Sequence, residues 1–152
     1  MQTLLKEDYI FFDSDVHTKE EALSFLSEKA KELGLTDNQK GLYEDFMKRE
    51  EEFSTGLQDG FAIPHAKSEH AKDVAILFLS TKNDIEWGTM DDQPVNYLFA
   101  LVVPTANAGN DHLMMISKLA TSLLDDDFKV KVKETKDKKQ LVEYILTKMK
   151  ED

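Results

Sequence analysis

The run Val95-Asn-Tyr-Leu-Phe-Ala-Leu-Val-Val103 is the longest β-like stretch of the chain, and Pro104 ends it. A second run, Val74-Ala-Ile-Leu-Phe-Leu79, is apolar at every position and has the length of a strand. Strands that are apolar on both faces lie inside sheets whose two sides are covered by other elements. These two runs therefore predict a buried central sheet.

The rest of the chain predicts shorter strands and several helices around that sheet. Short apolar segments predict strands over 9–12, 61–63 and 85–87. Caps and helical spacing predict five helices. The first runs from the capping box at Thr18 to Gly34, and the second from a cap at Thr36 or Asp37 to the charged run 48–52. The third runs from a cap at Asp111 to Leu124, and the last two lie over 125–133 and 141–149. Because helices and strands do not alternate strictly, we expect one α/β domain over residues 1–152, with a central mixed β-sheet and helices packed on its faces.

Composition excludes several functions. The 152 residues carry 19 basic and 30 acidic side chains, a net charge of −11, which argues against nucleic acid and anionic lipid as partners. Cysteine is absent, so disulfides, thiolate zinc sites and a cysteine nucleophile are excluded. Glycine-rich nucleotide-binding motifs are also absent, so no nucleotide site is indicated. Without a membrane-length apolar run or a cleavage signature, the expected location is cytoplasmic.

His65 is the first candidate for reactive chemistry, because it follows the predicted strand over 61–63 and Pro64. Proline fixes the backbone and donates no hydrogen bond, so the imidazole is expected at a rigid strand end. A histidine in this setting can carry or face a phosphoryl group. A polar side chain that only ends a strand fits the same spacing.

The loop just upstream is a candidate phosphoryl-binding loop, formed by Ser54, Thr55, Gly56 and Gly60. Glycines let backbone N–H groups approach an anion closely, and successive N–H groups form an anion-binding nest. We therefore expect this loop to present N–H groups beside His65.

His112 and Arg49 are two further candidates. His112 falls at a predicted helix start, where free N–H groups stabilise anions and disfavour the imidazolium. Arg49 is the only arginine of the chain, and a guanidinium binds phosphate through two hydrogen bonds. In the alternative interpretation, His112 has no role. Arg49 then only balances the dipole of its helix, beside a solvated acidic face at 50–52.

No metal site is expected. His65 and His70 are five residues apart and lack a carboxylate at ligand spacing. The carboxylates at 84, 86, 91 and 92 are interpreted as a solvated turn around Trp87, rather than as an acid–base pair.

A series of motifs resembles one known family. In chain order they are Lys19-Glu-Glu-Ala-Leu23, Arg49-Glu-Glu51, Ser54-Thr-Gly-Leu57, Gly60-Phe-Ala-Ile-Pro-His65, Asp91-Asp-Gln-Pro-Val95, the run ending at Pro104, and His112-Leu113. Together they resemble the IIA component of the bacterial sugar phosphotransferase system, fructose–mannitol class, over nearly the whole chain. The chain departs from that family at Gln58, Ala66 and Asp92, where glycine is common, and at Phe61, which replaces a smaller aliphatic residue and is expected to narrow the pocket.

The resemblance implies a phosphoryl carrier, a protein-to-protein phosphotransferase component. In this family the active histidine accepts a phosphoryl group from phospho-HPr and passes it to a cysteine of the IIB component, and the membrane IIC component is involved only indirectly. The resemblance assigns the carrier role to His65, through Nε2, with His112 and Arg49 lining the site. It implies no metal, nucleotide or other cofactor.

The biological role stays open between two alternatives. The first is sugar uptake, with fructose as the expected sugar and mannitol or galactitol as alternatives. The second is a regulatory, nitrogen-related IIA protein that signals by its phosphorylation state. A sensor domain of a transcription regulator and a hydrolase are less well supported, because the acidic chain contains no DNA-binding segment and hydrolysis would defeat a carrier.

Overall fold

The computed structural model describes residues 4–106 and 110–150, and for residues 110–112 it describes the backbone alone. A five-stranded mixed sheet forms the centre. Its strands are β1 (Ile10–Ser14), β2 (Phe61–Ala62), β3 (His65–Ser68), β4 (Ala75–Ile85) and β5 (Val95–Pro104). β1 lies parallel to β4, β4 antiparallel to β5, and both β2 and β3 parallel to β5. The predicted α/β fold with a mixed central sheet is confirmed.

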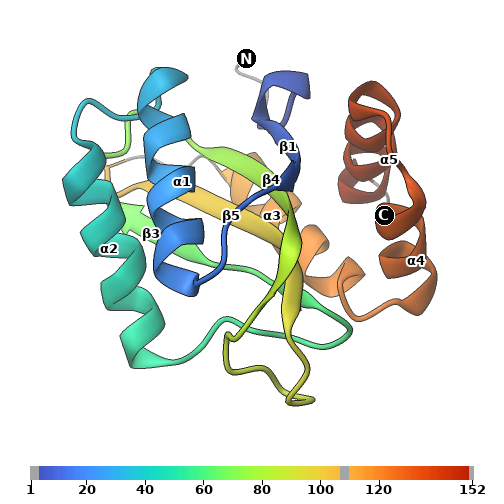
Figure 1. Ribbon diagram of the computed structural model, residues 1–152. Helices are drawn as coiled ribbons and strands as arrows, with labels where there is room; N and C mark the ends of the chain where they lie inside the picture. Colours follow the sequence, from blue (N-terminus) through green and yellow to red (C-terminus); the bar gives the residue numbers. More distant parts are fainter. Residues whose placement is uncertain (1–3, 107–109, 151–152) are drawn as a thin grey trace.

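Helices lie on the two sides of this sheet. They are the short 3-10 helix η1 (Glu7–Tyr9) and the α-helices α1 (Lys19–Glu32), α2 (Gln39–Glu52), α3 (Asn110–Ser122), α4 (Asp126–Glu134) and α5 (Lys138–Lys150). Figure 1 shows α1 and α2 side by side in front of the sheet and α3 behind it. In the part of the chain described, no helix is both long enough and apolar enough to cross a bilayer.

The core is centred on Phe99 of β5. Its ring lies 5.0 Å from that of Phe78, 6.3 Å from that of Phe61 and 6.4 Å from that of Phe128. These contacts join β5 to β4, β2 and α4. Phe61 is fully buried in this stack, so the expectation that it narrows a pocket is wrong.

Two strand predictions are corrected. Ile85 ends β4 and pairs with Val95, so the segment 85–87 is not a separate strand. After β2 the chain passes Pro64 and pairs with β5 again as β3, so His65 begins a strand and does not end one. The sequence of β3 is polar, and its pairing depends on the free edge of β5 more than on its own pattern.

Helix starts follow the predicted chemistry with one correction. Thr18 Oγ1 accepts from Glu21 N–H at 3.0 Å, as a capping residue does. The cap of α2 is Asn38, whose side chain accepts from Gly41 N–H at 2.9 Å; it is neither Thr36 nor Asp37. Thr36 Oγ1 instead accepts from Asn38 N–H. The side chain of Asp111, the predicted cap of α3, lies outside the described residues.

Replacing Phe99 by alanine is expected to lower the free energy of unfolding by about 3–5 kcal/mol, because it removes a buried ring and leaves a cavity between β5, β4 and α4. Urea denaturation followed by far-UV circular dichroism measures this. Phe53, which is 78% exposed, provides the matched control: Phe53→Ala should change the value by no more than about 0.5 kcal/mol. Equal effects of the two substitutions would contradict the assigned core.

Candidate functional site

His65 is the half-buried first residue of β3 and lies opposite Leu101 of β5. Its Nδ1 lies 3.0 Å from the carbonyl oxygen of Ile63. Since a carbonyl only accepts, Nδ1 carries the proton and donates it to Ile63. The neutral ring therefore has its lone pair on Nε2.

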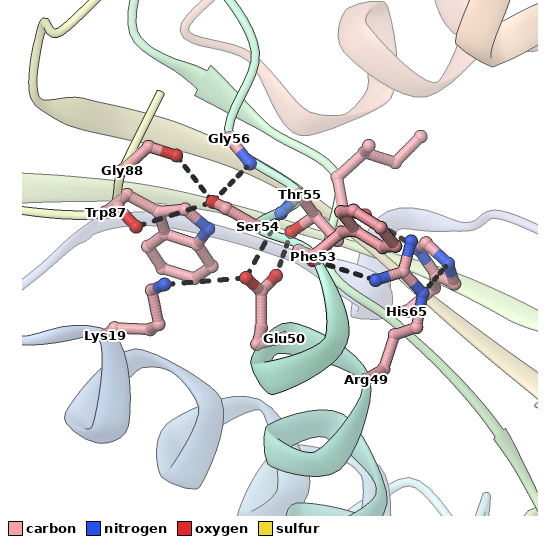
Figure 2. Close-up of polar contacts among 11 residues, drawn as sticks. Lys19, Arg49, Glu50, Phe53, Ser54, Thr55, Gly56, His65, Trp87 and Gly88 are labelled. Carbon is pink, nitrogen blue, oxygen red and sulfur yellow. Dashed lines mark hydrogen bonds and ion pairs between the residues drawn. The ribbon is translucent and has the colours of Figure 1, made fainter. Parts of the chain in front are cut away.

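Arg49, in the last turn of α2, meets that second nitrogen. Its Nε–H donates to Nε2 of His65 at 3.0 Å, which requires the same tautomer. Its Nη1 donates to the carbonyl of Phe53 at 2.8 Å. Figure 2 shows the guanidinium held between these two acceptors. The structure therefore brings together Arg49 and His65, two of the residues that the sequence singled out.

The cleft at this pair contains two cations that the sequence analysis missed. Its lining consists of Asp45, Lys48, Arg49, Glu52, His65 and Lys67. Lys67 lies two residues after His65 in β3, a spacing that places both side chains on one face of the strand. This spacing was the available signal, but it carries no information until β3 is known to be a strand.

In the loop over 54–60, where an anion nest was predicted, three successive N–H groups already have protein acceptors. Thr55 N–H donates to Glu50, Gly56 N–H to the hydroxyl of Ser54 at 3.2 Å, and Leu57 N–H to the carbonyl of Phe61 at 2.8 Å. The Ser54 hydroxyl in turn donates to the carbonyl of Gly88 (Figure 2). These bonds tie the loop to α2, to β2 and to the turn at Gly88.

Glycine is required at both loop positions by the path of the backbone. A Cβ on Gly56 would lie 2.6 Å from the carbonyl oxygen of Gly88, so a side chain is excluded. Gly60 has φ +88°, a conformation that favours glycine, and its carbonyl accepts from the N–H groups of Asn96 and Tyr97. Both glycines fix the path of the chain into β2.

Glu50 is buried at only 6% exposure, so the interpretation of residues 50–52 as a solvated acidic face is wrong for this residue. His112 lies in the first turn of α3, but its side chain is outside the described residues and its predicted place at the site remains a prediction. Among the residues that the structure describes, no group of three histidine or acidic side chains could hold a metal ion.

The chain matches a protein family described as "Phosphoenolpyruvate-dependent sugar phosphotransferase system, EIIA 2" over residues 3–148. A fructose-specific EIIA component of Haloferax volcanii is 32% identical, with 99% of this chain and 97% of that protein covered. A nitrogen regulatory protein of Bradyrhizobium diazoefficiens is 34% identical, with 80% of this chain and 78% of that protein covered.

Solved structures share the fold. Nitrogen regulatory protein IIA-Ntr from Neisseria meningitidis superposes with a TM-score of 0.82 at 26% identity, covering 93% of this chain and 96% of that one. IIA mannitol from Escherichia coli superposes with a TM-score of 0.71 at 20% identity, covering 95% of this chain and 98% of that one.

The hydrogen bonds of His65 predict its tautomer. In the neutral ring, ¹⁵N-detected NMR should show the proton on Nδ1 and an unprotonated Nε2, because Ile63 accepts and Arg49 donates. His17, whose Nε2 lies 3.3 Å from a carboxylate oxygen of Asp15, provides an internal contrast in which the acceptor faces the other ring nitrogen. A ring of His65 protonated mainly on Nε2 would be incompatible with both hydrogen bonds.

Proposed function

Because the chain belongs to the type-2 EIIA family of the phosphoenolpyruvate-dependent sugar phosphotransferase system, we propose that it is a phosphoryl carrier that uses His65 Nε2. The observation that carries this proposal is the hydrogen bond from Nδ1–H to Ile63, which leaves Nε2 unprotonated at the cleft. The donor is phospho-HPr and the acceptor a cysteine of a IIB component. Such a carrier works in the cytoplasm and meets the membrane IIC component only through IIB.

Each half-reaction forms one bond to phosphorus and breaks another. The Nε2 lone pair attacks phosphorus, the P–N bond of phospho-HPr breaks, and its electrons stay on the HPr nitrogen. In the second step the IIB thiolate attacks, and the electrons of the His65 P–N bond return to Nε2. The proton on Nδ1 stays in place throughout, so alignment and charge, more than acid–base chemistry, determine the rate.

Arg49 must exchange partners during this cycle. In the unphosphorylated protein its Nε–H occupies the lone pair that attacks phosphorus. As the phosphoryl group arrives, the guanidinium leaves Nε2 and donates to the phosphoryl oxygens, to which its planar fork of donors is suited. Lys48 and Lys67 line the same cleft and add positive charge near the group.

Sugar uptake is the role that we propose, with a fructose-like sugar first. The fructose-specific relative, which is matched over nearly its full length, supports this role. The second candidate is a regulatory carrier, supported by the nitrogen regulatory relative and by the superposition on IIA-Ntr. Both roles require the same phosphohistidine and differ in the acceptor.

The test is incubation with phosphoenolpyruvate, enzyme I and HPr, followed by mass spectrometry under conditions that preserve acid-labile phosphate. We expect one phosphoryl group on His65. Adding fructose-, mannitol- or galactitol-class IIB domains should then identify the acceptor by loss of that group. Phosphorylation without transfer to any of the three would favour the regulatory role, and no phosphorylation would refute the carrier.

His65→Ala is expected to abolish phosphorylation, because no neighbouring group replaces the covalent acceptor atom. Phosphate-affinity gel electrophoresis after the HPr reaction measures this. His17→Ala, at an exposed position, is the control and should be phosphorylated like the parent protein. Full phosphorylation of the His65 variant would move the carrier to another residue.

His112→Ala should leave phosphorylation possible and slow onward transfer to IIB, because it removes a helper and not the acceptor. Losing one stabilising donor costs about 10²–10³ in rate, and the effect should be of that order or smaller. Rapid-quench measurement of each half-reaction separates the two steps. Phosphate on His112 of the parent protein would reverse the assigned roles.

A further inference from the structure

We propose that Glu50 is a positioning residue of this site, whose buried carboxylate fixes the segment 53–55 and thereby aims Arg49 at His65. The kinetic part of this inference rests on the proposed carrier function. Its structural part concerns the unphosphorylated protein and is tested without phosphoryl transfer.

Both oxygens of the Glu50 carboxylate are engaged. One accepts the hydroxyl of Thr55, and the other accepts Thr55 N–H at 3.1 Å and lies 3.5 Å from Nζ of Lys19. The Glu50 side chain is 2% exposed and that of Lys19 20%. Moving a carboxylate out of water costs free energy. A buried carboxylate is therefore stable only when hydrogen-bond donors or a cation replace the water.

Arg49 and Glu50 hold the same short segment from opposite sides. Adjacent helix residues point in different directions, and Figure 2 shows Arg49 turned toward His65 and Glu50 toward Thr55 and Lys19. Arg49 Nη1 is bound to the carbonyl of Phe53, two residues before Thr55. The acceptor that orients the guanidinium thus lies in the segment that Glu50 anchors.

The end of α2 lacks the residue that commonly closes a helix. Its C-cap residue, Phe53, is extended at φ −153° and ψ 135°, so the helix ends without the left-handed residue that commonly closes a last turn. The side chain of Phe53 is exposed and adds no core contact. The direction in which the chain leaves α2 therefore depends on bonds of the segment itself: the Glu50–Thr55 pair, the Ser54 hydroxyl on Gly88, and Ile63 N–H on the Thr55 carbonyl.

Trp87 supplies a reporter for this network. It is the only tryptophan of the chain and is buried, and Nζ of Lys19 lies 5.0 Å from the centre of its ring. Lys19 thus joins the indole to the Glu50 carboxylate. A change at Glu50 should alter the emission of Trp87 without involving the cleft at His65.

The experiment compares four variants of the full chain. Glu50→Gln keeps the shape and removes the charge, and Thr55→Val removes the hydroxyl. Thr55→Ser keeps the hydroxyl, and Glu51→Gln makes the same charge change at an exposed neighbour. The readouts are Trp87 emission, the NMR signal of Arg49 Nε–H, and the single-turnover rate of phosphorylation by phospho-HPr.

For Glu50→Gln and Thr55→Val we expect altered Trp87 emission, faster water exchange of Arg49 Nε–H, and phosphorylation about 10- to 100-fold slower, since small misplacements of a positioning group have effects of this size. Thr55→Ser and Glu51→Gln should resemble the parent protein in all three readouts. Parent-like exchange and rate in a folded Glu50→Gln protein would overturn the proposal. If Glu50→Gln does not fold, Thr55→Val decides by the same criteria.

A double-mutant cycle tests whether Glu50 acts through Arg49. Glu50→Gln should add no further loss of rate to Arg49→Met, since the group that it positions is already gone. Additive losses would overturn the positioning role. If the parent protein is never phosphorylated, the carrier function fails, while the exchange of Arg49 Nε–H still decides the structural claim.

Discussion

The interruption of backbone pairing at Ile63–Pro64 is the constraint on which the site depends. Pro64 has no N–H to give to the sheet, and its carbonyl accepts from Leu101 of β5 at 2.9 Å. Ile63 N–H turns instead to the carbonyl of Thr55. The Ile63 carbonyl is left to accept from His65, so a break in the sheet edge leaves Nε2, the nitrogen that we propose to carry the phosphoryl group, without a proton.

The same constraint links the glycine-containing loop to the site. Thr55 bonds through its carbonyl to Ile63 and through its N–H and hydroxyl to Glu50. One residue therefore joins the end of α2, which carries Arg49, to the strand edge that carries His65. The loop holds Arg49 and His65 close together, and the N–H groups of Thr55, Gly56 and Leu57 are bound within the protein.

Much of this arrangement was predictable from the sequence, and what was not depends on pairing across the fold. The apolar runs of β4 and β5 were predicted because hydrophobicity is a local signal. For Arg49 and His65 the residues alone left alternatives open, and the family resemblance placed the two side chains at one site. β3 was missed because its residues are polar and its pairing is supplied by β5. The burial of Glu50 was missed because positions 50, 51 and 52 are all glutamate. Only the contact with Thr55, which the fold creates, makes Glu50 different from its two neighbours.

A carrier must release its phosphoryl group as readily as it accepts it, so neither state can be stabilised far above the other. Arg49 fits this requirement because the guanidinium has a partner in each state, Nε2 of His65 before transfer and the phosphoryl oxygens in the cycle proposed here. Because Arg49 exchanges one partner for another, it stabilises both the unphosphorylated and the phosphorylated state. The equilibrium between the two states therefore shifts little. The bond to the Phe53 carbonyl provides a fixed point for that exchange, which makes the rigidity of the segment after α2 a condition for reversible transfer.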